Sequence, residues 1–405
     1  ISMLSERDLI ETAKCIDLNN KSAFLYKQVL GELTWRIEGP FDSSYSLAVL
    51  NRETAIALDE LGYNVALHST EGPGGFEPSP EFLEQNSLIK KLHKKSYEIS
   101  SSSADIISRN LYPPRVDDMQ SQIKLLHHYA WEESGFPQEW VNNFNAHLSG
   151  MTCLSHHVQK IMIDNGVSIP MQVSGCGVDH WERITASTNY TIKAKQFKFL
   201  HVSSCFPRKG VDCLLQAYGE KFTSSDDVSL IIKTFPNPHN EIHHWLANAR
   251  QNNPNYPDVL IIEKDLHDTE LKTLYQLCDI LVSPTRAEGF GLPMAEAILS
   301  GLPVITTAWS GQLDFCNSEN SWLIDFEFEY ADTHFDIFLS AWAKPDIDSL
   351  AKAMVDAYSS THELRKSKAK AGKDLLLKNF LWTDVAQRYV NAVSDMLENK
   401  SNHYQ

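Results

Sequence analysis

The chain has no closely spaced pairs of cysteines. Its seven cysteines lie singly along 405 residues, and no C-x-x-C occurs among them. An odd count without close pairs argues against a disulfide framework and against a cysteine-bound zinc site. Several of the cysteines lie in apolar runs, which predicts buried free thiols in a reducing compartment.

Long apolar segments are also missing. No run approaches the ~18 residues that a membrane-spanning helix needs. The first residues, ISMLSERDLIETAK, lack the basic start and apolar centre of a signal peptide. We therefore expect a cytoplasmic protein with at most a peripheral contact at the inner face of a membrane.

Positive charge is scarce. The formal net charge is −16, from 36 Lys and Arg against 52 Asp and Glu, which argues against nucleic acid as a partner. The densest basic segment is KKLHKK at residues 90–95. Two interpretations of it stay open: a solvated helix face, or a contact with an anionic acceptor or a lipid headgroup.

The sequence also lacks metal-binding motifs. Adjacent histidines occur at 127–128, 156–157 and 243–244, but neighbouring side chains on a helix or strand point apart. No H-E-x-x-H motif is present among the sixteen histidines. We therefore expect no metal and no other cofactor.

What the sequence does contain is an alternation of strand and helix patterns. In the second half, the strand patterns lie at 197–203, 228–233, 259–262, 280–283 and 304–306. In the first half, they lie at 33–38, 64–67, 105–108, 123–129, 151–154 and near 173. No G-x-G-x-x-G follows the first strand pattern, so the dinucleotide fingerprint is absent. The length allows two domains, and the alternation predicts an α/β fold of two Rossmann-like, doubly wound domains, the second with five parallel strands.

The stretch at residues 280–307, ILVSPTRAEGFGLPMAEAILSGLPVITT, has the pattern of a strand, a glycine loop, a helix and a second strand. Pro293 suits the start of the helix, and Gly301 suits the position just past its end. Glu288 lies in the loop and Glu296 lies in the helix, with seven residues between them. Taken singly, Glu296 could complement the helix dipole and Glu288 could be a solvated loop charge.

Taken together, these residues resemble the Glu-x7-Glu signature, in its E-G-F-G-L-P-x-x-E-A form, of retaining glycosyltransferases of the GT-B fold, family 4. The resemblance implies that Glu288 contacts the donor sugar ring and that Glu296 holds the ribose of the nucleotide. It further implies that the backbone amides of Phe290, Gly291 and Leu292 bind sugar hydroxyls.

The same resemblance divides the chain into domains. The segment GCGVD at 175–179 is similar to the short hinge motif that ends the N-terminal domain of the family. The implied units are an acceptor-side domain over 1–180 and a nucleotide-sugar-binding domain over 190–381, facing each other across a central cleft. A last helix, over about 382–405, is expected to cross back to the first domain.

Two adjacent cations follow the first strand pattern of the second domain, within SSCFPRKG at 203–210. Arg208 and Lys209 precede a helix start, where a pyrophosphate would meet positive charge and free N–H groups. An Arg-Lys pair is more commonly part of an ordinary basic loop, but this loop and the Glu288 loop leave the same edge of one parallel sheet. The family usually separates its two cations by several residues, so Lys233, at the end of the next strand, is a third candidate.

The first loop of the first domain contains four further candidates for the cleft. For Gly39, Ser43, Ser44 and Tyr45, a position facing the cleft and an ordinary turn are both open.

The end of the strand at 123–129 offers a contact on the other side of the donor sugar. Many members of the family carry a histidine there. Here the strand end offers His127, His128, Trp131 and Glu132. Trp131 and Glu132, with a proline at 137 and a tryptophan at 140, resemble a subgroup of the family that has an aromatic-Glu pair at this place.

The resemblance implies a metal-independent transfer of a hexose from a nucleotide-diphosphate sugar, with UDP-glucose favoured over GDP-mannose. The acceptor would be a hydroxyl of a glycan or of a lipid-linked saccharide, in polysaccharide biosynthesis, and the configuration would be retained. The alternative is a nucleotide-sugar epimerase on the same fold.

Overall fold

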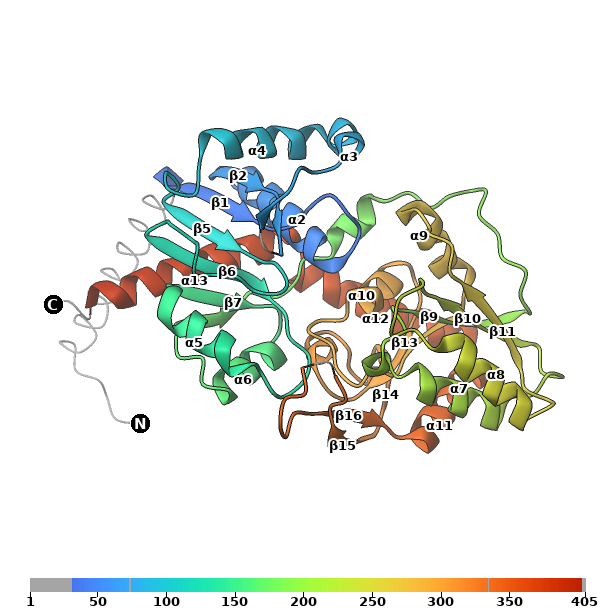
Figure 1. Ribbon diagram of the computed structural model, residues 1–405. Coiled ribbons are helices and arrows are strands. Elements are labelled where there is room, and N and C mark those ends of the chain that lie inside the picture. The colour runs from blue at the N-terminus through green and yellow to red at the C-terminus, as the bar shows by residue number, and fades with distance from the viewer. Residues whose placement is uncertain (1–30, 73, 334, 403–405) are drawn as a thin grey trace, which may run out of the picture.

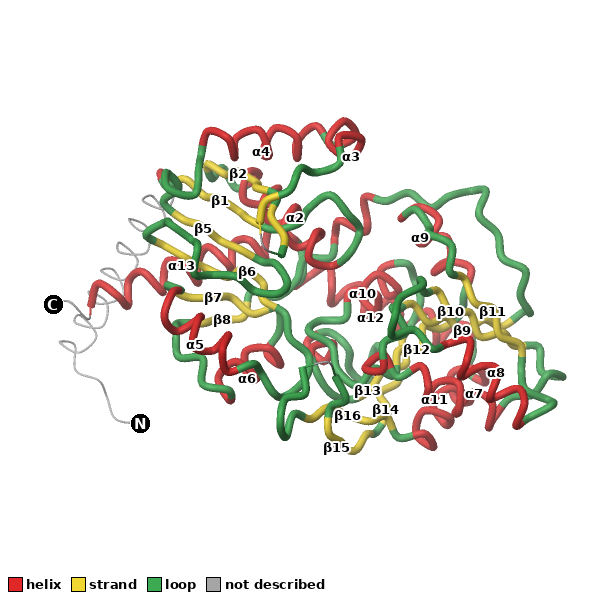
Figure 2. Tube along the Cα trace, viewed as in Figure 1, coloured by secondary structure: helices red, strands yellow, loops and turns green. Residues whose placement is uncertain are grey.

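The computed structural model describes residues 31–72, 74–333 and 335–402. Its centre is a pair of six-stranded parallel sheets, one in each half of the chain (Figures 1 and 2). The first sheet has the order β2-β1-β5-β6-β7-β8. Its strands are β1 (Thr34–Glu38), β2 (Asn64–His68), β5 (Ile106–Arg109), β6 (Ile123–Tyr129), β7 (Gly150–Cys153) and β8 (Met171–Val173).

The helices of the first half lie between these strands in sequence. They are α2 (Ser46–Glu60), α3 (Pro80–Gln85), α4 (Ser87–Glu98), α5 (Gln138–His147) and α6 (His156–Asp164), and a small hairpin is formed by β3 (Thr70–Glu71) and β4 (Gly74–Gly75). One buried apolar cluster lies between the sheet and α5 with α6, and a second involves α2 and α4.

The second sheet has the order β11-β10-β9-β12-β13-β14. Its strands are β9 (Phe197–Val202), β10 (Val228–Lys233), β11 (Asp258–Ile262), β12 (Ile280–Ser283), β13 (Val304–Thr307) and β14 (Ser321–Ile324). Its helices are α7 (Val211–Lys221), α8 (Ile242–Asn252), α9 (Asp268–Leu277), α10 (Leu292–Leu299), α11 (Ile347–Ser359) and α12 (His362–Asn379). Because the strand order reverses between β9 and β12, a crevice for a ligand is expected where the loops leave the carboxyl ends of these two strands.

The strands predicted from apolar periodicity agree with the structure to within about two residues, but the prediction of five strands in the second sheet is wrong. β14 is the sixth strand, and its sequence, SWLI, is too short to stand out among the polar residues before it. The acidic and aromatic segment after it forms an antiparallel hairpin, β15 (Phe326–Tyr330) with β16 (Ala341–Pro345). The alternation FEFEY in β15 has the period of a strand.

The two sheets share one continuous apolar core. A single cluster of buried side chains includes Trp35 of β1, Phe290 before α10 and Trp382 of the last helix. That helix, α13 (Trp382–Asn402), packs on α2, β7 and β8. It therefore crosses from the second sheet back to the first, as the resemblance implies (Figure 1).

The predicted hinge segment meets the start of α13. The backbone N–H of Val178 donates to the carbonyl of Phe380 at 2.9 Å. The N–H of Trp382 donates to the carboxylate of Asp179 at 2.7 Å. The connection between the sheets is thereby fixed to the crossing helix; the domain boundary at 180–190 itself stays a prediction.

Two findings concern composition. The six cysteines in the described ranges are all free and buried, as predicted. Among the helices of those ranges, none combines the length and the apolar character needed to cross a membrane.

Candidate active site

The loop between β12 and α10 forms one wall of the site. Gly291, the N-cap of α10, has φ +99°, a left-handed conformation that a side chain would strain. The helix starts at Leu292, Pro293 follows in its first turn, and Gly301 lies just past the end. The local prediction from residues 280–307 is therefore confirmed.

The start of α10 leaves backbone donors without a main-chain partner in the part of the chain that the structure describes. Within the described residues, the N–H groups of Phe290, Gly291 and Leu292 make no backbone hydrogen bond, as expected for the first turn of a helix. The ring of Phe290 is buried against Phe315 and Phe380, with centroid distances of 4.8 and 5.5 Å. Phe290 can therefore serve a ligand only through its backbone.

The loop between β9 and α7 brings the two cations to Glu288. Lys209 Nζ lies 2.5 Å from Glu288 Oε1, and Arg208 Nη1 lies 3.3 Å from Glu288 Oε2. Arg208 also donates to the carbonyl of Ala287 at 3.0 Å. The structure thus gathers three residues that the sequence analysis selected from segments about 80 positions apart.

Close backbone packing holds the two loops together. The N–H of Arg286 donates to the carbonyl of Arg208 at 2.7 Å, and the hydroxyl of Thr285 donates to the same carbonyl at 3.1 Å. Gly210 has φ +68°, and a Cβ there would lie 1.9 Å from the carbonyl oxygen of Pro284. Glycine at this position therefore allows the cation loop to close on the Glu288 loop.

The charged side chains of the site shift one another's pKa values. Glu288 is only 7% exposed; burial alone would raise the pKa of its carboxyl, but Lys209 and Arg208 bring it below its ordinary value. Burial lowers the pKa of Lys209, and the neighbouring Arg208 lowers it further. Glu288 is therefore an ionised carboxylate held by two cations.

Glu132 reaches the same cations from the first half of the chain. Its Oε1 lies 2.9 Å from Arg208 Nη2, and its backbone carbonyl is 2.9 Å from Nε2 of His157. Arg208 is thus shared between a carboxylate from each half of the chain. Among the candidates at this strand end, Glu132 is the one whose side chain the structure brings to Arg208.

His128 lies elsewhere. Its side chain is fully buried, its Nδ1 is 2.7 Å from the hydroxyl of Ser174, and its ring packs near Trp382 and Tyr389 of α13. Burial lowers the pKa of His128 to about 3. The ring is therefore neutral and belongs to the packing under the crossing helix, and a contact with a donor sugar stays a prediction.

Glu296 lies one turn into α10 and apart from the cation cluster. The hydroxyl of Tyr275 donates to its Oε2 at 3.2 Å. Burial raises the pKa of Glu296 to about 8, although the tyrosine hydrogen bond opposes this. At neutral pH this carboxyl is largely protonated.

The third cation candidate does not join the cluster. Lys233 ends β10, which neighbours β9, and its Nζ donates to the carbonyl of Thr234 at 2.7 Å. Burial lowers the pKa of Lys233. Lys233 lies at the carboxyl edge of the sheet, and its contact with a pyrophosphate stays a prediction.

The first loop of the first half follows β1, at the switch point of the first sheet. Gly39 is buried, and its N–H donates to the carbonyl of His68 at 3.1 Å. Ser43, Ser44 and Tyr45 are exposed, and the Tyr45 hydroxyl donates to Glu71 at 2.6 Å. The structure does not bring these four residues into contact with Glu288, so their cleft role stays a prediction.

Sequence reasoning missed Arg286, two residues before Glu288. Its guanidinium donates to both oxygens of Asp212, at 2.9 and 2.7 Å, and to Glu329 of β15 at 3.0 Å. It also donates to the carbonyl of Pro207 at 2.6 Å. Arg286 thereby ties the cation loop, the Glu288 loop and the hairpin together; the sequence signal for it was an arginine within the stretch at 280–307, two residues before Glu288.

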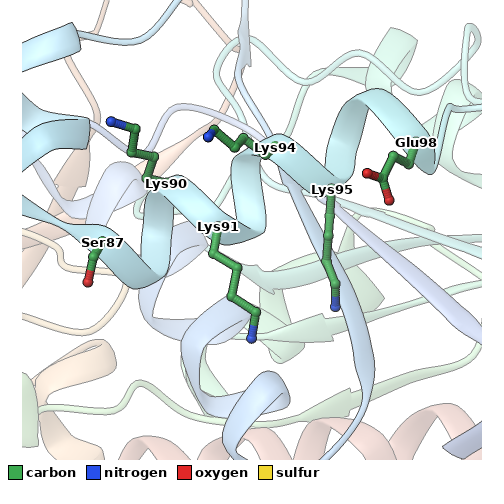
Figure 3. A pocket seen from close by; sticks show the side chains of 6 residues that line it. All are labelled: Ser87, Lys90, Lys91, Lys94, Lys95 and Glu98. Carbon is green, nitrogen blue, oxygen red and sulfur yellow. The ribbon is translucent and has the colours of Figure 1, made fainter.

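The four lysines of the basic segment at 90–95 lie at the surface of α4, whereas Leu92 and His93 of the same segment are buried. The lysines lie in two ranks along the helix, Lys90 with Lys94 and Lys91 with Lys95, around a surface pocket of about 430 Å³ (Figure 3). Lys91 lies 3.6 Å from Asp59, and its side chain is 61% exposed. The lysines therefore form a solvated helix face, as one of the two interpretations predicted. The contact with an anionic acceptor or a lipid headgroup stays a prediction.

Three or more His, Cys, Asp or Glu side chains in an arrangement fit for a metal ion do not occur in the described ranges. Whether the reaction needs a metal stays a prediction.

Comparison with known proteins gives one family match, in the second half of the chain. Residues 182–333 match the family model described as glycosyl transferases group 1, which covers the second sheet and both loops of the site. A comparison with curated protein sequences finds no match.

Solved structures align over about nine tenths of this chain. The sucrose-phosphate synthase of Thermosynechococcus elongatus aligns over 91% of this chain and 100% of its own, with a TM-score of 0.65 and 15% identity. HepE of Anabaena in complex with UDP-glucose aligns over 90% and 100%, with a TM-score of 0.62 and 15% identity. A glycosyltransferase of Rickettsia africae aligns over 91% and 99%, with a TM-score of 0.61 and 17% identity. At these identities the likeness establishes the fold, which is GT-B.

Proposed function

We propose that the protein transfers a hexose from a nucleotide-diphosphate sugar to an acceptor hydroxyl, with retention of configuration. The observation that carries the proposal is the cluster of Arg208, Lys209 and Glu288 beside the free N–H groups of α10. A cluster of cations and helix amides at a sheet switch point suits a pyrophosphate. The match of residues 182–333 to glycosyl transferases group 1 supports transfer as the reaction class.

In the proposed reaction, negative charge develops on the departing phosphate. Arg208, Lys209 and the amides of α10 would stabilise that charge as fixed dipoles and cations, so the reaction requires no metal. Glu288 and Glu132 would then accept hydrogen bonds from hydroxyls of the donor sugar. The departing phosphate would take the proton of the acceptor hydroxyl on the same face of the ring, which retains the configuration.

UDP-glucose is the first donor to test. HepE of Anabaena, whose structure holds UDP-glucose, shares the fold, and a UDP-sugar agrees with the expectation from the sequence. As acceptors we propose a glycan or lipid-linked saccharide of a polysaccharide pathway. The family match favours transfer over the alternative of epimerisation.

The main test is the substitution Glu288→Gln. It keeps the size of the side chain but removes the charge, and we expect kcat to fall by about 10²-fold or more, as losing a transition-state contact does. Affinity for the nucleoside diphosphate should be kept or increased, because the uncharged side chain no longer competes with the phosphates for Lys209 and Arg208. Transfer is measured with UDP-glucose and an acceptor panel in excess EDTA, and nucleotide affinity is measured by calorimetry.

Two outcomes would overturn this proposal. One is normal turnover by Glu288→Gln with a verified donor and acceptor. The other is formation of an epimer of the UDP-sugar by the wild type without any acceptor, which identifies an epimerase.

The substitution Arg208→Ala tests the pyrophosphate assignment. Affinity for UDP should fall about 10- to 100-fold, because a charge-assisted contact is worth roughly 1.5–3 kcal/mol, while affinity for uridine should change little. Arg208→Lys should lie between, since lysine keeps the charge and loses the planar fork. Lys221→Ala, at the exposed end of α7, is the control. Equal losses for UDP and uridine would remove the phosphate assignment.

The raised pKa of Glu296 predicts a pH-dependent nucleotide affinity. The free carboxyl, with a pKa of about 8, is largely protonated at pH 7, whereas two ribose hydroxyls donate best to the ionised form. Binding should therefore release a proton, and affinity should rise with pH up to about pH 8, by at most about tenfold per unit. Calorimetry between pH 6 and 9 on the wild type and Glu296→Gln isolates this effect, because ionisation of the phosphates is common to both proteins. A pH profile unchanged by Glu296→Gln would refute the ribose assignment.

The lysine ranks of α4 predict a peripheral contact with an anionic acceptor or lipid surface. Replacing Lys90, Lys91, Lys94 and Lys95 by Ala should abolish binding to vesicles with phosphatidylserine or phosphatidylglycerol, since each lysine near such a surface contributes about 1 kcal/mol. The control replaces Lys366, Lys370 and Lys378, which are exposed on α12. Sedimentation of vesicles at two salt concentrations gives the result. Equal binding by both variants would refute this contact, and the lysines would then form only a solvated helix face.

A further inference from the structure

The hairpin β15–β16 and its connection reach across to the loop at 131–136 in the first half of the chain. The N–H of Ser134 donates to the carbonyl of Ala341 at 2.9 Å. In return, the N–H of Ala341 donates to the hydroxyl of Ser134 at 2.8 Å. The N–H of Gly135 donates to the hydroxyl of Ser340 at 3.0 Å. We call residues 326–333 and 335–345 the interdomain clasp.

A buried carboxylate is part of this contact. Glu133 is 5% exposed and accepts hydrogen bonds from the hydroxyls of Thr333, at 2.8 Å, and of Ser340. A carboxylate buried this deeply would be costly without these donors. Glu133 therefore couples the loop to the clasp through two specific hydrogen bonds.

An aromatic side chain of the clasp packs into the first half of the chain. The ring centroid of Phe335 lies 5.0 Å from that of Trp131, 5.7 Å from Trp140 and 6.4 Å from Tyr112. Phe338, three residues on, is 88% exposed. The same connection thus holds one phenylalanine that joins the halves and one that serves as a control.

The other end of the clasp contacts Arg286, in the loop between β12 and α10. Glu329 is 3.0 Å from Arg286 Nε and accepts from the indole N–H of Trp342 at 3.0 Å. The N–H of Ala343 donates to the carbonyl of Arg286 at 3.0 Å. The contacts therefore run without a gap from Arg286, beside Glu288, to the loop of the first half.

Glu132 lies between two residues that the clasp holds, Trp131 and Glu133, and its carboxylate lies on Arg208. Building on the proposed function, we propose that Phe335 and Glu133 are positioning residues, which hold the loop at 131–136 so that Glu132 acts on the donor sugar. A clasp with a purely structural role would change stability alone. A positioning clasp acts through Glu132.

Hydrogen exchange tests the contact without any activity. In Phe335→Ala, the amides of residues 131–136 should exchange at least tenfold faster, because their partners on the clasp are released, whereas Phe338→Ala should leave them unchanged. Ser340→Ala, which removes the hydroxyl shared by Gly135 and Glu133, should act like Phe335→Ala and serves if that variant does not fold. Unchanged exchange at 131–136 in both variants would overturn the inference, whatever the protein catalyses.

A double-mutant cycle tests the positioning. Phe335→Ala should lower kcat with UDP-glucose by about 10- to 100-fold, as a misplaced catalytic group does, with UDP affinity kept within threefold. Because the effect runs through Glu132, adding Phe335→Ala to Glu132→Gln should cause little further loss, and Phe335→Leu should restore most of the activity. If the losses in kcat of the two single variants multiply in the double variant, the positioning role is overturned. An equal loss of kcat in Phe338→Ala would overturn it as well. A wild type without transferase activity would instead refute the proposed function and leave the exchange result to decide on the clasp.

Discussion

The arginine at position 208 is the residue on which the site depends, because it is shared by a carboxylate from each half of the chain. Glu288 and Glu132 both lie within hydrogen-bond or ion-pair distance of its guanidinium. A half-buried cation needs such partners, since removing water from a charge without replacing its hydrogen bonds costs several kcal/mol. The planar fork of arginine can serve two carboxylates at once, which the single ammonium of Lys209 does less well. Arg208 therefore contributes both to the contact between the two halves and to the charge balance of the site.

The location of that arginine follows from the order of the strands. β9 and β12 are neighbours at the reversal point of the second sheet, so the loops after them leave the same edge side by side. Gly210 and Pro284 let these loops pack at backbone distance. The start of α10 then adds N–H groups that its own helix cannot pair. A parallel sheet with this order provides the position, and a few loop residues provide the chemistry.

Local sequence patterns predicted most of the fold and some of the residues that the structure gathers around Arg208. Strand β12, its glycine loop and α10 are contiguous, so periodicity and capping residues were enough to predict this unit, and the resemblance to the Glu-x7-Glu signature then singled out Glu288 and Glu296. Glu132 and His128 could not be separated, because the choice depends on how β6 ends and on α13, which covers His128 from the far end of the chain. The clasp was out of reach for the same reason: Ser134 and Ala341 are 207 positions apart, and no local pattern relates them. β14 was missed because four residues give too little periodicity.

The charged side chains around Arg208 balance one another, and this bears on what the site can bind. Arg208 and Lys209 carry two positive charges, and Glu288 and Glu132 carry two negative ones. Under the proposed function, a pyrophosphate takes over the two cations and leaves both carboxylates without partners. Hydroxyl groups of a donor sugar can satisfy those carboxylates, whereas a nucleoside diphosphate alone cannot. The cost of leaving the buried carboxylate of Glu288 without a partner therefore favours the complete sugar nucleotide over the product nucleotide, so that the return of Glu288 and Glu132 to the two cations assists release of the product.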